Sequence, residues 1–125
     1  MLDLSHKKLE VWKLSIELVK EVYKLTATFP KDEIFNLTSQ MRRAAVSVVS
    51  NLSEGAARKS KPDKNRFFII SRSSLVELDS QVEIGIMLNY FNEEKIQTLK
   101  RIAESVFKIL SKLISNNETQ YSLTG

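Results

Sequence analysis

The sequence of 125 residues contains no cysteine, a single histidine, three glycines and two prolines. Without cysteine, the chain can form neither disulfides nor thiolate metal sites. The scarcity of glycine and proline argues against a sheet protein with many turns and favours long regular elements. The one histidine, His6, cannot supply the Glu-x-x-His pairs of a di-iron bundle or the ligands of a zinc site. We therefore expect no metal and no cofactor.

Long apolar runs are also missing from the sequence. No stretch approaches the roughly 20 apolar residues of a membrane span, and the first residues, MLDLSHKKLEVWK, lack the apolar run of a signal peptide. The absence of cysteine suits a reducing compartment. We expect a soluble, cytoplasmic protein with no membrane partner.

A catalytic constellation is missing as well. Serines are plentiful, but no histidine lies within helix reach of any of them, and no glycine-rich phosphate loop occurs. Paired carboxylates could carry out acid–base chemistry without histidine, with Glu54 and Glu77 as the candidates. Because such residues are more often ion-pair partners, we expect the protein not to be an enzyme.

Four segments have the apolar periodicity of amphipathic helices. Their expected bounds are about residues 8–29, 37–58, 61–89 and 93–115, and residues 116–125 are expected to fray. Pro30 should stop the first helix, whereas Ser60 and Asn92 are the expected N-caps of the third and fourth. With short connections, this pattern predicts one all-α domain over residues 1–125, an antiparallel up-down-up-down four-helix bundle.

The first helical segment has an unusually wide apolar face. One stripe consists of Trp12, Ile16, Val19 and Tyr23, and an adjacent stripe consists of Leu14, Leu18, Val22, Leu25 and Phe29. A monomer would expose part of this surface, so we expect a homo-oligomer.

Gly55 allows two interpretations. It could end the second helix as a left-handed residue, or it could lie inside the helix and let another part of the chain approach closely. We favour the interior, because the following residues, Ala56, Ala57 and Arg58, are good helix formers.

The net charge of +4 is concentrated in the middle third of the chain. Residues 1–38 carry six basic and six acidic groups, residues 39–72 carry eight and two, and residues 73–125 carry five and seven, so the segments contribute 0, +6 and −2. A local excess of this kind favours a polyanionic partner. The alternative is a solvated, lysine-rich turn between two helices.

The second helix carries a polar stripe with two interpretations. In the first, small and acidic residues form a hydrogen-bond network that fixes the register of helices or subunits. Its candidates are Ser47, Asn51, Glu54 and Glu77. In the second, cations face solvent and contact phosphates. These candidates are Arg42, Arg43, Arg58, Lys59, Lys61, Lys64 and Arg66.

Aromatic residues add little to the second interpretation. Phe67 and Phe68 follow Arg66 but fall at core spacing, so we expect both to be buried. Without exposed aromatic rings there is no stacking platform for single strands. Any contact with nucleic acid would then be mostly to the backbone.

Several motifs of this sequence occur together in one known family. They are Leu9-x-Val11-Trp12, Tyr23-x5-Phe29-Pro30, Gln40-x-Arg42-Arg43-Ala44-x2-Ser47, Asn51-Leu52-x-Glu54-Gly55-x2-Arg58 and Ser74-Leu75-x-Glu77-Leu78. With them the chain resembles, from about Leu9 to Leu113, the four-helix-bundle proteins of the 23S rRNA intervening-sequence family, also called S23-type proteins.

The resemblance implies an up-down bundle that assembles into a ring, typically a pentamer. Related accessory proteins of diversity-generating retroelements are more strongly basic pentamers that bind nucleic acid and a reverse transcriptase. Our first hypothesis is therefore a non-enzymatic oligomeric bundle that binds RNA or DNA backbone through its middle third. The alternative is a protein-interaction scaffold, in which the arginine and glutamate stripe serves subunit packing and the partner is another protein.

Overall fold

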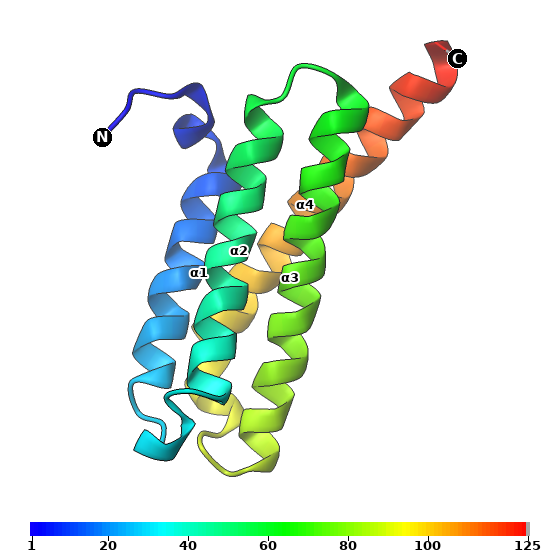
Figure 1. The fold of residues 1–125 in the computed structure, drawn as a ribbon. Coiled ribbons are helices and arrows are strands. Elements are labelled where there is room, and N and C mark those ends of the chain that lie inside the picture. The colour runs from blue at the N-terminus through cyan, green and yellow to red at the C-terminus, as the bar shows by residue number, and fades with distance from the viewer. Residues whose placement is uncertain (125) are drawn as a thin grey trace.

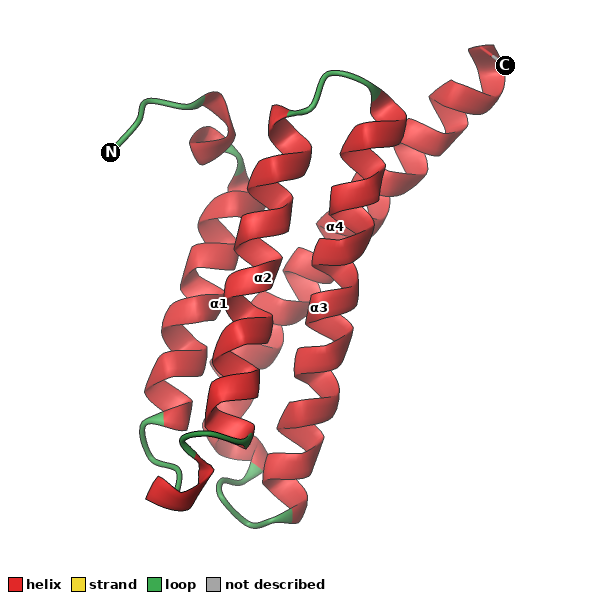
Figure 2. Ribbon diagram, in the orientation of Figure 1, coloured by secondary structure: helices red, strands yellow, loops and turns green. Residues whose placement is uncertain are grey.

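The structure is a computed structural model that describes the backbone of residues 1–124 and the side chains of residues 1–118. It contains four long helices, α1 (Glu10–Thr26), α2 (Leu37–Ala57), α3 (Lys61–Met87) and α4 (Gln97–Thr124). Three short 3-10 helices, η1 (Ser5–Lys8), η2 (Lys31–Glu33) and η3 (Glu93–Ile96), precede α1, α2 and α4. Within this part of the chain there is no strand (Figure 2), which confirms the predicted all-α class.

The four helices lie side by side as a bundle (Figure 1). The α2–α3 turn lies at one end, together with the two chain ends, and the α1–α2 and α3–α4 connections lie at the other. The C-terminal part of α4 leans away from the other helices. None of the helices in the described residues is long and apolar enough to cross a membrane.

Side-chain caps mark the start of α3 and of the short turn before α4. The Ser60 hydroxyl accepts a hydrogen bond from the Asp63 amide (3.2 Å), as predicted for the start of α3. The Asn92 side chain accepts from the Lys95 amide (3.1 Å), but the turn that it caps is η3, and α4 follows directly.

The first and third helices are shorter than predicted, and the fourth begins later, at Gln97. The first helix is shorter at both ends, since Leu9 is extended and α1 ends at Thr26. The third ends at Met87, because Asn89 adopts a left-handed conformation with a φ of 61°, which stops a helix.

The fourth helix continues beyond its expected end at Ser115 and reaches Thr124. Asn65 of α3 supports the first part of this extension: its side-chain amide donates to the Ile114 carbonyl (3.1 Å) and its oxygen accepts from Asn117 (2.9 Å). Gly125, at the end of the expected frayed tail, lies outside the described residues.

The core lies along the bundle axis and is built by one stripe from each helix. Its largest fully buried side chains are Leu18, Val22, Met41, Val48, Leu52, Leu78, Val106 and Leu110. One of the two stripes predicted on the first helix points to this core, and the other reaches it only in part, through the partly buried Trp12 and Val19. Leu18, Val22 and Leu25 are buried, whereas Ile16 and Tyr23 are exposed.

Two glycines allow aromatic rings to pack directly against helix backbone. Gly55 lies inside α2, as predicted, and a β-carbon there would lie 2.6 Å from the buried Phe68 ring and 3.0 Å from the Lys64 carbonyl oxygen. Gly85 of α3 is similar, since a β-carbon would lie 2.5 Å from the Phe91 ring. Because real β-carbons do not approach other atoms this closely, a side chain at either position would force the neighbouring ring to shift.

Candidate nucleic-acid interface

The α2–α3 turn is short and held at both sides. Arg58 takes an extended conformation that ends α2, and Ser60 caps α3 with Pro62 in its first turn. The Lys64 ammonium group donates to the Ala56 carbonyl (3.0 Å), one of the carbonyls that the end of α2 leaves without a helical partner. These contacts fix the hairpin and with it the side chains that it carries.

Five of the seven predicted phosphate contacts gather at this turn. Between positions 58 and 66 the chain carries five cations and one acid, Asp63, a net charge of 5 − 1 = +4. Three of the cations are exposed and two are half-buried. The five cations, called the basic turn below, are Arg58, Lys59, Lys61, Lys64 and Arg66.

Two arginines of the basic turn lie over one aromatic ring. The guanidinium carbons of Arg58 and Arg66 are 4.7 Å and 5.0 Å from the centre of the Phe67 ring. Phe67 is half-buried, so the prediction that it belongs to the core is wrong, whereas Phe68 is buried as expected. Cation–π contacts at exposed sites contribute about 0.5–1 kcal/mol, enough to bias where the two guanidinium groups lie.

The other two predicted phosphate contacts lie elsewhere on α2. Arg43 is exposed but precedes Arg58 by about four helical turns. Arg42 is half-buried: its Nε donates to the Thr26 hydroxyl (2.9 Å) and its guanidinium carbon lies 4.4 Å from the centre of the Tyr23 ring. Arg42 therefore joins α2 to α1, and we leave it out of the interface.

The predicted polar network is only partly assembled. The Asn51 amide donates to the Ser47 carbonyl (2.9 Å) and hydroxyl (3.0 Å), and the Ser47 hydroxyl is 2.7 Å from that of Ser74. Glu54 is exposed and instead pairs with Arg58 at 3.3 Å. Ser47, Asn51 and Ser74 thus link α2 to α3, and Glu54 belongs to the surface of the basic turn.

Glu77 and Ser71 make further hydrogen bonds near this network. The Glu77 carboxylate accepts from the Gln81 side chain (3.2 Å) on its own helix. The buried Ser71 hydroxyl donates to the Val48 carbonyl across α2 and α3 (2.7 Å). Sequence reasoning missed Ser71 and Ser74 as network members, although their spacing with Leu78 along one face of α3 was a usable signal.

The N-terminal segment places two more cations near the basic turn, which counting charges along the sequence could not show. η1 lies at the same end of the bundle as the basic turn (Figure 1) and carries Lys7 and Lys8. The His6 ring lies against Trp12, with 5.7 Å between the ring centres, and the Trp12 Nε1 donates to Ser53 of α2 (3.1 Å). These contacts attach η1 and the start of α1 to α2, beside the basic turn.

Comparisons with known proteins address the family and the fold. A family model described as 23S rRNA-intervening sequence protein matches residues 7–112. The chain is also similar to a crystal structure from Bacteroides thetaiotaomicron VPI-5482, described as a protein with unknown function from the S23 ribosomal protein family. The TM-score is 0.76 at 20% identity, over 83% of this chain and 97% of that one, so this likeness shows the fold. No curated protein matches the chain.

Proposed function

The chain belongs to the family of 23S rRNA-intervening sequence proteins, and on this basis we propose that it is a non-enzymatic oligomer that binds the phosphate backbone of RNA or DNA through the basic turn. The observation that carries the proposal is the density of cations at one end of an otherwise nearly neutral molecule. Residues 58–66 contribute +4, as much as the net charge of the whole chain. Lysine and arginine side chains that neutralise phosphates release condensed counterions, which drives binding.

The surroundings of the basic turn support this use. Ion pairs between described side chains are Lys24–Glu21 and Arg58–Glu54, so most cations of the turn make no ion pair with another described side chain. The hairpin is anchored by Ser60 and Lys64, which lowers the conformational entropy that a ligand has to overcome. Contacts of this kind position a backbone and read little sequence.

Assembly would multiply these contacts. The resemblance leads us to propose an up-down-up-down bundle that forms a pentameric ring in the cytoplasm, and the positions of the turns in Figure 1 support the helix order. Several basic turns on one ring would bind a polyanion more strongly than a single turn, because the second contact is intramolecular. The family name refers to intervening sequences of 23S rRNA, so a structured RNA is the first probe to use.

Fluorescence anisotropy between about 50 and 200 mM salt tests this proposal, because phosphate contacts weaken strongly over that range. We expect wild-type protein to bind a structured RNA and a duplex DNA with steep salt dependence. The variant Lys59→Ala/Arg66→Ala should bind more weakly and with a smaller salt slope, since it removes two exposed cations of the basic turn.

The matched control is Lys31→Ala/Lys95→Ala, which removes two exposed cations at the other end of the bundle. It should bind as the wild type does. An equal loss in both variants would show that only net charge matters and would refute the basic turn as the interface. No binding by the wild type at low salt would favour the alternative, a scaffold whose partner is another protein.

A further inference from the structure

A long groove runs between α3 and α4. Its volume is about 1070 Å³, and its walls are mainly apolar. Leu75 and Val82 of α3 and Leu99 of α4 form buried parts of the floor, whereas Val76 is 52% exposed and Phe107 is 42% exposed. Exposed apolar side chains around a hollow of this size indicate a surface that another molecule covers.

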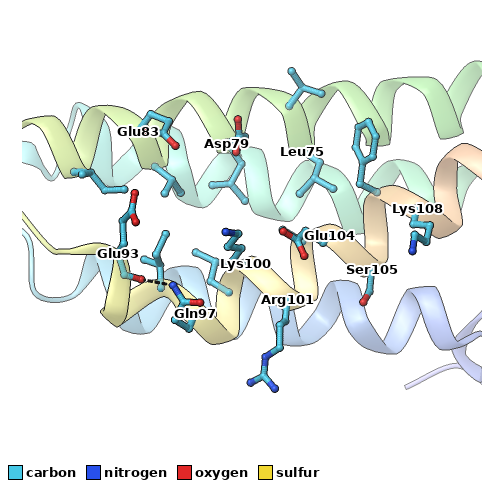
Figure 3. A pocket seen from close by; sticks show the side chains of 18 of the residues that line it. Leu75, Asp79, Glu83, Glu93, Gln97, Lys100, Arg101, Glu104, Ser105 and Lys108 are labelled. Atoms are coloured by element: carbon cyan, nitrogen blue, oxygen red, sulfur yellow. Dashed lines mark hydrogen bonds between the residues drawn. The ribbon is translucent and has the colours of Figure 1, made fainter.

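The two banks of the groove differ in charge (Figure 3): α3 contributes only acids, whereas α4 contributes three cations and one acid, Glu104. Asp79 and Glu83 lie along α3, and Lys100 and Lys108 lie along α4. All four are exposed, and none takes part in the ion pairs found among the described side chains. The α3 bank is therefore a row of acids that a cationic neighbour would fit.

A second apolar face lies over α1 and α2. It contains the exposed part of the second stripe of α1, with Ile16 40% exposed and Tyr23 42% exposed. On α2, Val46 is 43% exposed, and it lines a hollow of about 380 Å³ together with Ile16. The row beside this stripe is exposed and mainly basic, with the lysines Lys13, Lys20 and Lys24 and one acid, Glu17. Lys24 pairs with Glu21 on the same helix at 3.7 Å.

The two faces lie on opposite sides of the bundle. α1 packs against α2 and α4, and α3 packs against the same two helices, so α1 and α3 are diagonal neighbours. A face over α1 and α2 and a face over α3 and α4 therefore point in opposite directions. Each copy of the chain presents both faces to its surroundings.

We infer that the α1–α2 face of one copy covers the α3–α4 groove of a second copy. Ile16 and Tyr23, seven residues apart on α1, have the spacing with which a helix fills a groove. The lysine row of α1 then faces the acids Asp79 and Glu83 of the second copy, so the charges are complementary. Pairing two α1–α2 faces would instead bring two lysine rows together.

This contact joins two different surfaces, and so it is heterologous. Repetition of a heterologous contact closes a ring when the rotation per copy allows it and otherwise makes a filament. The inference rests on the oligomer of the proposed function and gives that oligomer its surfaces. It does not depend on nucleic-acid binding, and its tests use the protein alone.

The absence of cysteine makes crosslinking selective, because each introduced thiol is unique. We would co-express Ile16→Cys and Phe107→Cys chains with different tags and treat the assembly with a short bismaleimide. Both side chains are about two-fifths exposed, so neither variant should disturb the fold. A crosslinked dimer should form in the mixture and in neither variant alone.

The control pairs Ile16→Cys with Glu94→Cys, an exposed residue of η3 outside both faces. It should give no dimer. A dimer from Ile16→Cys alone would overturn the inference, because it would show that two α1–α2 faces meet. A monomer by light scattering, or an oligomer without the mixed crosslink, would overturn it as well.

Charge reversal tests the polar part of the contact. Lys20→Glu should weaken self-association by roughly tenfold in Kd, since it places like charges at the rim. Adding Asp79→Lys in the same chain should restore most of the affinity, because each contact between copies again joins opposite charges. Light scattering without nucleic acid measures both. A double variant as weakly associated as Lys20→Glu would refute the pairing, even if RNA binding by the basic turn is intact.

Discussion

The two ends of the bundle share the same kind of core packing but differ in the charge of their surfaces. Inside, a glycine of one helix lies against a phenylalanine ring that follows it in the chain: Gly55 with Phe68 at one end, and Gly85 with Phe91 at the other. In each case the ring fills the space that a side chain would need. The same packing thus closes both ends of the core.

Outside, the charges differ. The connection from 58 to 66 carries +4, whereas residues 27–36 have one cation and two acids, and residues 88–96 also have one cation and two acids, so each contributes 1 − 2 = −1. Closing the core requires shape but no particular charge, so the charge of the exterior is free to serve another purpose. This difference is the reason for assigning ligand binding to the basic turn alone.

Replacing the two phenylalanines with alanine tests the core packing that both ends share. It has the largest expected effect on the free energy of unfolding. Phe68→Ala should lower the free energy of unfolding by about 3–5 kcal/mol, because it leaves a cavity between α2 and α3. Phe91→Ala should fall at the low end of that range, since Phe91 lies in a connection that can collapse onto Phe29. Urea unfolding measures both. A loss below about 1 kcal/mol at either ring would break the comparison.

Filling the glycine sites should have an intermediate effect. Alanine favours a helix by about 1 kcal/mol over glycine, but overpacking costs about 1–3 kcal/mol. Gly55→Ala should be destabilising by about 1–2 kcal/mol, because its β-carbon meets a buried ring and the fixed Lys64 carbonyl. Gly85→Ala should cost less, because it meets only the Phe91 ring. Thermal unfolding of the two variants checks this order, and the reverse order would contradict it.

The smallest predicted effect concerns Tyr90 at the acidic end. Partial burial and the negative charges of Glu33 and Asp32 raise the pKa of the Tyr90 phenol. Above about pH 10 the unfolded chain loses this proton first, so the contribution of Tyr90 to stability is complete below that pH and disappears as the pH rises through the raised pKa. Tyr90→Phe should therefore lose less stability between about pH 9 and 11 than the wild type. Parallel unfolding curves for the two proteins would refute the prediction.

Much of the fold could be predicted because its signals are local. Apolar spacing identified four helices, Ser60 identified the start of α3, and the helix formers after Gly55 identified it as an interior residue. The extension of α4 was missed, because its support comes from Asn65, 49 and 52 residues away from Ile114 and Asn117 in sequence.

The candidate site could be predicted only in part. Counting charges located the basic turn, since five of its cations are close in sequence and remain close in space. It could not separate Arg42, whose partners Tyr23 and Thr26 lie on another helix. Nor could it distinguish Phe67 from Phe68, because adjacent residues at the edge of an apolar face differ only in which neighbours cover them.

By itself, the sequence determined the number of long helices and the position of the charge excess, because each follows from residues within a few turns of one another. The tertiary structure decided which stripe of α1 is buried and which side of the bundle is left apolar. The two stripes of α1 are similar in composition, and only the positions of α2 and α4 against that helix select one of them. The part of the other stripe that stays exposed, with Ile16 and Tyr23, is the surface on which the inferred contact between copies depends.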